Sequence, residues 1–217
     1  MSDTTRYISG RPIRVGLQLL GDQVLDPVAS ARAAEAAGFD IVMVADHIGA
    51  ECHAPLVNLT AMAAGTERIR LGTYVLNNDM RNPVQLAWEA ATLDRVSGGR
   101  FELGLGAGHT MHEYEETGIA FDAPSLRKAR LREAVEIIRP LLAGETVDFE
   151  GEHYRVEGAT VTAAVQTPLP IVVGSQGEAM LRHIGEHADG VGLMGLGRTL
   201  PDGHRHTVRW DADRLDE

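Results

Sequence analysis

Short apolar segments alternate with longer helical segments along most of this chain, and this alternation limits the possible folds. Four apolar segments, predicted as strands, begin near residues 13, 39, 69 and 100. The spacing of about 30 residues is the length of a strand followed by a crossover helix, which makes neighbouring strands parallel. The segment 39–45 (FDIVMVA) is continuously apolar, as in a strand buried on both faces. We therefore predict an α/β fold with a parallel sheet.

The remaining elements continue this pattern. We predict strands at 13–20, 39–45, 69–76, 100–106, 171–174 and 190–194, a further strand at 205–210, and helices at 27–37, 54–64, 83–96, 125–142 and 178–187. Residues 144–156 alternate about a turn and predict a small hairpin. Two architectures fit repeated β/α units, a doubly wound open sheet and an eight-fold barrel. With six strands, or seven at most, the chain is too short for eight regular units.

Composition excludes several classes of function. The 217 residues carry 20 basic and 31 acidic side chains, a net charge of −11, which argues against a nucleic-acid-binding face. The single cysteine, Cys52, excludes a disulfide framework. No apolar run approaches the length of a membrane span, and residues 1–12 lack the apolar region of a secretory signal. We expect a soluble cytoplasmic protein that binds neither nucleic acid nor membranes.

Polar residues follow one predicted strand after another, where parallel α/β folds place their sites. These strand ends are Gln18, Asp46-His47, Asn77-Asn78-Asp79, Gly106-Ala107-Gly108-His109 and Gly174-Ser175-Gln176-Gly177. An imidazole exchanges protons near neutral pH, and a neighbouring carboxylate orients it. Asp46 and His47 are therefore candidate catalytic residues, although such a pair can equally cap the next helix.

Two glycine-rich turns are candidate ligand contacts. The spacing Gly104-x-Gly106-x-Gly108 allows a flat ring or a phosphate close to the backbone, but it also suits a tight strand-exit turn. The turn from Gly174 to Gly177 directly precedes a predicted helix, whose free N–H groups suit a phosphate. We predict phosphate binding there.

No metal site is predicted. The sequence HTMHE at 109–113 lacks the spacing of a zinc-protease helix, and no cysteine completes a ligand set. His183 and His187 lie four residues apart on a predicted helix, and we expect them to be solvated. The stretch 113–116 is expected to form an exposed acidic face.

Three segments together resemble the bacterial luciferase-like flavin oxidoreductase superfamily, and within it the oxidoreductases that use the deazaflavin coenzyme F-420. They are AAEAAGFDIVMVADH at 33–47, IRLGTYVLNNDMRNPVQLAWEAATLDRVSGGRFELGLGAG at 69–108, and PIVVGSQGEAMLRHIGEHADGVGL at 170–193. The resemblance implies a (β/α)8 TIM barrel with a hairpin inserted after the fourth unit. Here it implies one domain, 1–217, that is an incomplete barrel of about six units with a polar tail at 195–217.

The resemblance also assigns roles to matching positions. It implies that His47, oriented by Asp46, is a proton relay beside the deazaflavin ring, with His109 as a second catalytic residue. It places a non-prolyl cis peptide at Tyr74-Val75, whose bulge backs the ring. The other positions that it implies for cofactor binding are Asp46, Asn77, Gly106 and Gly108, with Gly174, Ser175 and Gly177 as the phosphate loop. His109 stands where sugar-phosphate dehydrogenase relatives have a catalytic glutamate, and His112 where they have an asparagine.

The implied function is hydride transfer between coenzyme F-420 and a small organic substrate. An FMN-dependent monooxygenase and a non-catalytic, shortened flavin-binding protein stay open as alternatives. The family continues for two more β/α units, which supply part of the substrate pocket. Because an incomplete barrel leaves two exposed strand edges, we expect a homodimer.

Overall fold

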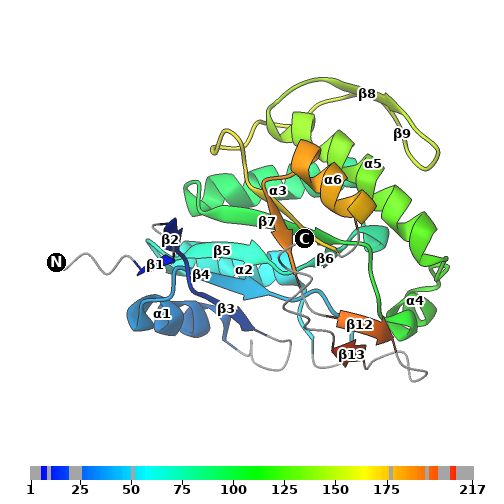
Figure 1. The fold of residues 1–217 in the computed structure, drawn as a ribbon. Coiled ribbons are helices and arrows are strands. Elements are labelled where there is room, and N and C mark those ends of the chain that lie inside the picture. Colours follow the sequence, from blue (N-terminus) through cyan, green and yellow to red (C-terminus); the bar gives the residue numbers. More distant parts are fainter. Residues whose placement is uncertain are drawn as a thin grey trace.

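A parallel sheet forms the centre of the molecule in the computed structural model (Figure 1). The structure describes residues 6–8, 11–19, 26–49, 52–175, 178–193, 196–199 and 206–208. The strand order is β11-β10-β7-β5-β4-β3, and the short strand β6 also pairs with β7. The bounds are β3 Gly16–Leu19, β4 Ile41–Val44, β5 Arg70–Thr73, β6 Leu76–Asn77, β7 Phe101–Gly106, β10 Ile171–Gly174 and β11 Gly190–Gly192.

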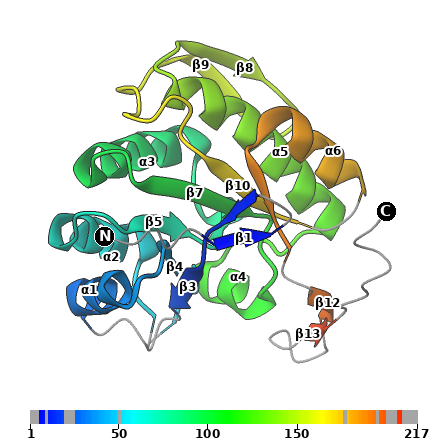
Figure 2. The ribbon, with the colours of Figure 1, turned by 60° about the vertical axis from the view of Figure 1, so that its left-hand side comes forward.

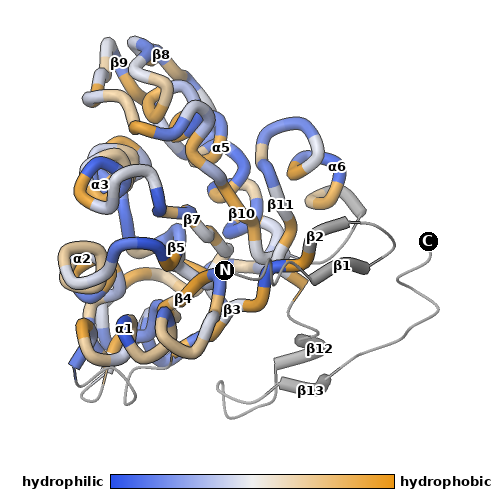
Figure 3. The backbone as a smooth tube through the Cα atoms, turned by 90° about the vertical axis from the view of Figure 1, so that its left-hand side faces the viewer, coloured by the Kyte–Doolittle hydropathy of each residue, from blue (hydrophilic) through white to orange (hydrophobic). Residues whose placement is uncertain are grey.

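The long helices all cover the outer side of this sheet. They are α1 Pro27–Ala37, α2 Pro55–Gly65, α3 Pro83–Ser97, α5 Pro124–Leu142 and α6 Glu178–His187. Each contacts the next in the order of the strands, from α1 to α6 (Figures 2 and 3). A doubly wound sheet would have helices on both faces, whereas a single outer layer is the wall of a barrel. The described strands therefore confirm the predicted incomplete barrel and exclude the doubly wound alternative.

The hydrophobic core lies between the sheet and the helices. On β7, the side chains of Phe101, Leu103 and Leu105 are fully buried. The alternate positions, Glu102 and Gly104, line the inner side of the barrel wall together with residues of β4 and β5. Within the described residues, no helix is both long enough and apolar enough to cross a membrane.

Helix ends follow local sequence rules. At α1 the Asp26 side chain accepts a hydrogen bond from the N–H of Ala29 at 2.9 Å, and Pro27 occupies the first turn. The helix ends at Gly38, which has φ +82° and whose N–H bonds to carbonyls of the last turn. These positions agree with the predicted start and stop of this helix.

Several predicted elements need correction. The expected strand 69–76 is divided into β5 and β6 by Tyr74 and Val75, and the hairpin, β8 Val147–Glu150 and β9 Arg155–Ala159, runs beyond residue 156. Helix α4, Met111–Thr117, was not predicted. Two small antiparallel pairs lie outside the sheet, β1 Arg6–Ile8 with β2 Arg11–Ile13 and β12 Leu196–Thr199 with β13 His206–Val208. The last of these strands lies within the predicted 205–210.

Thr73 closes the gap between β5 and β7 where the ladder is interrupted. Its hydroxyl accepts a hydrogen bond from the N–H of Gly104 at 2.8 Å and donates one to the carbonyl of Gly104 at 2.9 Å. A Cβ atom on Gly104 would lie 1.9 Å from the carbonyl oxygen of Thr73. Only glycine allows this approach, and the two buried backbone groups of residue 104 stay paired.

Candidate active site

The carboxyl ends of the parallel strands meet at one edge of the sheet, and we call this edge the mouth. In register, Asn77 of β6 lies beside Gly106 of β7, which lies beside Gly174 of β10, which lies beside Gly192 of β11. The strand ends that the sequence singled out on these strands are therefore neighbours in space. Three of these four positions are glycines, so the row has little side-chain volume of its own.

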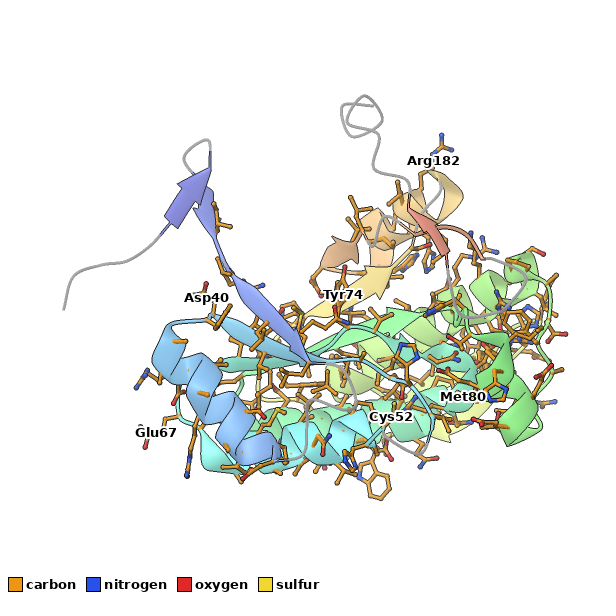
Figure 4. The ribbon with its side chains drawn as sticks, turned by 90° about the horizontal axis from the view of Figure 1, so that it is seen from below. Asp40, Cys52, Glu67, Tyr74, Met80 and Arg182 are labelled. Carbon is orange, nitrogen blue, oxygen red and sulfur yellow. The ribbon has the colours of Figure 1, made fainter. Side chains whose placement is uncertain are left out.

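The side chains of Tyr74 and Val75 occupy the space over this row of glycines. A Cβ atom on Gly106 would lie 2.6 Å from Cγ2 of Val75, and one on Gly174 would lie 3.1 Å from Cγ1 of Val75. A Cβ atom on Gly192 would lie 2.8 Å from the hydroxyl oxygen of Tyr74. Figure 4 labels Tyr74, which lies on the side of β4 and β5 opposite to α1 and α2. Because glycine has no side chain, these positions leave room for the Tyr74-Val75 bulge inside the barrel wall.

The Tyr74–Val75 peptide bond is cis, as the resemblance implied. Two neighbouring strands hold this segment by hydrogen bonds. The Tyr74 N–H donates to the carbonyl of Val44 at 3.0 Å, and the side-chain amide of Gln18 donates to the carbonyl of Tyr74 at 2.9 Å. The bulge therefore has a fixed place relative to β3 and β4.

His47 pairs with a carboxylate at the mouth, but that carboxylate belongs to Glu113 of α4. Nδ1 of His47 lies 2.6 Å from Oε1 of Glu113. The His47 side chain is 38% exposed and that of Glu113 is 8% exposed, so the pair has one accessible side. The ring of His109 meets that of His47 edge-on, with the centroids 5.7 Å apart. Two imidazoles and one buried carboxylate therefore gather at one place.

The hydrogen bond that His47 donates to the Glu113 carboxylate raises the pKa of His47 above its ordinary value of 6.5, with a further contribution from the charge of Asp46, although burial acts in the opposite direction. The charged form of His47 therefore persists to higher pH than in an isolated histidine. Its stabilisation of the fold is complete at pH values below 6.5 and is lost as the pH rises through the raised pKa.

Asp46 does not orient His47, and this part of the sequence prediction is wrong. Its carboxylate accepts hydrogen bonds from the N–H of Asn77 at 2.8 Å and from the guanidinium of Arg81 at 2.5 and 3.0 Å. The Asp46 side chain is 5% exposed. Asp46 therefore ties the end of β4 to the end of β6, and it contributes only its charge to His47.

Asn77 and Gly108 belong to a polar network behind the mouth. Oδ1 of Asn77 accepts hydrogen bonds from the N–H of Asp79 and from the hydroxyl of Tyr114, each at 3.1 Å. Gly108 has φ +73°, and a Cβ atom there would lie 2.1 Å from the Tyr114 hydroxyl. Burial raises the pKa of Tyr114 to about 12, so its hydroxyl stays protonated. Nδ2 of Asn77 is buried and has no hydrogen-bond partner among the described residues.

The predicted phosphate loop is only partly described. Gly174 ends β10 and Ser175 follows it at the mouth, half-buried, while Gly177 lies outside the described residues. Helix α6 begins at Glu178, as predicted. Gly174 lies one strand away from Gly106, on the same edge as Asn77. Phosphate binding at this turn stays a prediction.

Below the mouth, the inner side of the barrel wall lines an open cavity of about 500 Å³. Its lining includes Met43, Thr73, Tyr74 and Gly104. At its far end the buried carboxylate of Glu102 contacts the guanidinium groups of Arg14 and Arg70. Burial opposes the charge of Glu102, but the hydrogen bonds from both arginines lower its pKa overall. This end of the cavity therefore holds a paired carboxylate rather than a free acid.

Sequence reasoning missed Glu113, Tyr114 and Arg81. Glu113 was assigned to an exposed acidic face, whereas it is 6% exposed and faces His47. A signal was present, because Thr110-x-x-Glu113 has the pattern of a capping box and Gly118, with φ +72°, ends α4. In the structure the Thr110 side chain makes no capping bond, and the Glu113 carboxylate bonds to His47.

Replacing Glu113 by glutamine is expected to lower the pKa of His47. The substitution keeps the shape of the side chain and removes the charge, while the burial that lowers the pKa of His47 remains. A titration of the His47 ring followed by NMR, compared with His112→Ala as a surface control on the same helix, measures the change. An unchanged or raised pKa of His47 would contradict the pairing with Glu113.

Fold and site together define an α/β barrel protein whose mouth combines a row of glycines with a histidine–carboxylate pair. The statistical model of the luciferase-like monooxygenase family matches residues 12–211. The chain belongs to this luciferase-like family.

Relatives with assigned names include two F-420-dependent glucose-6-phosphate dehydrogenases. That of Nakamurella multipartita is 39% identical over 188 residues, which cover 82% of this chain and 55% of the relative. That of Kineococcus radiotolerans is 37% identical over 190 residues, which cover 83% of this chain and 56% of the relative. The chain thus spans about half the length of these curated relatives.

Solved structures show the same fold. The coenzyme F-420-dependent tetrahydromethanopterin reductase of Methanopyrus kandleri is 31% identical, with a TM-score of 0.70 over 82% of this chain and 55% of that one. An F-420-dependent secondary alcohol dehydrogenase, solved with an F-420–acetone adduct, is 25% identical, with a TM-score of 0.74 over 82% of this chain and 57% of that one.

Proposed function

We propose that this chain binds coenzyme F-420 at the mouth and takes part in hydride transfer between that coenzyme and a small organic substrate. The observation that carries the proposal is the combination of the glycine row, backed by Val75, with the His47–Glu113 pair and His109 at the same edge. The names of the relatives, which include F-420-dependent dehydrogenases and reductases, support the choice of cofactor.

The residues present fit a flat heterocycle with a phosphorylated arm. Because Gly106 and Gly174 have no side chains, Val75 packs directly over them, and the Tyr74-Val75 bulge would present its apolar surface to a ring. The buried Nδ2 atom of Asn77 has no hydrogen-bond partner in the part of the chain that the structure describes, and it offers an N–H donor for a ligand carbonyl. Ser175, which follows β10, would hold the phosphate near the start of α6, and the role of Gly177 stays a prediction because this residue lies outside the described part of the chain.

When bound, the deazaflavin would supply the site that accepts or donates the hydride. This chain's own part is to hold and move a proton. Since Glu113 occupies Nδ1 of His47, the atom available for exchange with a substrate hydroxyl or carbonyl is Nε2. Glu113 fixes the ring orientation and stabilises the imidazolium, and His109 lies close enough to act as a second polar contact.

A titration of the purified chain with coenzyme F-420 and, separately, with FMN tests the proposal. We expect saturable quenching of deazaflavin fluorescence and weaker binding of FMN. Loss of deazaflavin absorbance on addition of glucose 6-phosphate or a secondary alcohol would then identify the class of substrate. Binding of FMN alone, with oxygen consumption by the reduced form, would instead support a monooxygenase. Binding without turnover of any substrate would support a flavin-binding protein, and absence of both kinds of binding would overturn the proposal.

The homodimer stays a prediction. The strand order ends at β3 and β11, and neither strand pairs with a second neighbour in the sheet among the described residues. Parallel strands with open edges are commonly covered by another chain or segment. A partner chain along these edges would also lie beside the mouth.

A further inference from the structure

A second cluster of polar residues lies outside the barrel wall, between α5 and α6, which run side by side (Figures 1 and 2). Its members are Glu136 of α5 and His183 and His187 of α6. Each offers one ligand atom, and these atoms all lie within 4.8 Å of one another. The cluster is separate from the mouth, because α6 packs on the outer side of the sheet.

The spacing of the two histidines gives the cluster its geometry. Residues four apart lie on the same face of a helix, and the rings of His183 and His187 have centroids 4.4 Å apart. The sequence from His183 to His187, His-x-x-Glu-His, is a spacing that zinc-binding helices use. Glu136 comes from the neighbouring helix, with Oε1 4.0 Å from Nδ1 of His183. Two imidazoles and a carboxylate from a second element are a common ligand set for Zn²⁺.

His183 shows an independent sign of a missing ligand. Its side chain is only 11% exposed, and its Nε2 atom is buried without a hydrogen-bond partner among the described residues. A buried polar atom without a partner costs free energy, and an ion that binds His183 through Nε2 would remove this cost. The expectation that His183 is solvated is therefore wrong.

Two further properties of the cluster bear on ion binding, the acidic side chains around it and its access to solvent. Glu136 and Glu186 bring negative charge, with Glu186 Oε2 3.7 Å from Nε2 of His187. Opposing positive charges come from Arg132, which acts on His183, and Arg139, which donates hydrogen bonds to the carbonyl of His187. Glu136 and His187 are 40% and 39% exposed, so an ion can enter from solvent.

We propose that Glu136, His183 and His187 form a binding site for a divalent transition-metal ion, Zn²⁺ by ligand type, with water completing the coordination. Tetrahedral zinc ligands lie roughly 3 to 3.5 Å apart, so small side-chain rotations close the cluster around an ion. The bound ion would crosslink α6 to α5 and would thereby hold the fifth β/α unit against the fourth. The site does not depend on the proposed oxidoreductase function.

A zinc titration of the chain without a polyhistidine tag, in competition with a fluorescent chelator, tests this site. We expect one ion per chain in the wild type and at least a tenfold weaker affinity in His187→Ala and in Glu136→Gln. His53→Ala, which removes an exposed histidine elsewhere, and His47→Ala should leave the affinity unchanged. Since His183 is mostly buried and its replacement could unfold α6, the half-exposed His187 is the principal variant.

Two further measurements separate this site from other sites on the chain. Co²⁺ bound to the wild type should give visible absorption of a site with nitrogen ligands, and this absorption should be lost in His187→Ala. Amide hydrogen exchange of α6 should slow when Zn²⁺ is added. If the folded wild type binds no Zn²⁺, if His187→Ala binds as tightly as the wild type, or if His47→Ala loses the ion, the proposal is overturned.

Discussion

Replacing His47 by alanine is expected to lower kcat of the F-420-linked reaction by about 10²- to 10⁴-fold, the range for loss of a general acid–base group. His47 lies at the mouth with Nδ1 paired to Glu113, and its raised pKa keeps it able to give and take a proton around neutral pH. Removing the ring also leaves the buried Glu113 carboxylate without its partner. Deazaflavin absorbance during turnover measures the effect.

Two comparisons make this expectation specific. His112→Ala removes another histidine, 54% exposed, which forms surface ion pairs on α4, and its turnover should stay within twofold of the wild type. Glu113→Gln should move the pH limb of kcat/KM that His47 sets toward lower pH, since the pKa of His47 falls. Turnover by His47→Ala equal to that of the wild type would show that the proton relay lies elsewhere, with His109 the next candidate.

Replacing Gly104 by alanine is expected to reduce the free energy of unfolding by about 3 kcal/mol or more, because the added methyl group meets backbone instead of a movable side chain. Its Cβ atom would lie 1.9 Å from the Thr73 carbonyl oxygen. Relief requires β5 and β7 to separate, and this would stretch both hydrogen bonds between the Thr73 hydroxyl and the backbone of residue 104. The midpoint of urea unfolding gives the measurement.

A glycine in open space provides the matched control. Gly185 lies in α6, and a Cβ atom there would meet nothing within 4 Å. Gly185→Ala is therefore expected to stabilise the chain by up to about 1 kcal/mol through helix propensity. Equal effects of the two substitutions would show that the contact between Thr73 and Gly104 does not limit residue 104 to glycine.

The order of strands and helices was predictable because it depends on local sequence. The apolar strand 39–45, the proline at the start of α1 and the glycine at its end are all signals within a few residues. The repeat alone did not distinguish a barrel from a doubly wound sheet, since both have the same repeat, and the resemblance to the luciferase-like family made that choice. The side of the sheet on which helices pack is a property of the whole chain.

The candidate site was predictable in its position and less so in its pairings. Topology alone brings the ends of β4, β6, β7 and β10 to one edge, and the cis peptide at Tyr74-Val75 followed from the resemblance. Neither the topology nor the resemblance predicted the partner of His47. Glu113 is 66 residues away along the chain, and its burial depends on the placement of α4 over the mouth. Asp46, although adjacent in sequence, is held by Arg81 instead.

Val75 shares one pocket of space with the two strand-end glycines beside it, at positions 106 and 174. The three positions therefore share one limited volume. A larger side chain at residue 106 or 174 can be compensated by a smaller side chain at residue 75. Variants that reshape the mouth for a bulkier substrate should be built as pairs across these strands, because single enlargements would compete for the same few cubic ångströms.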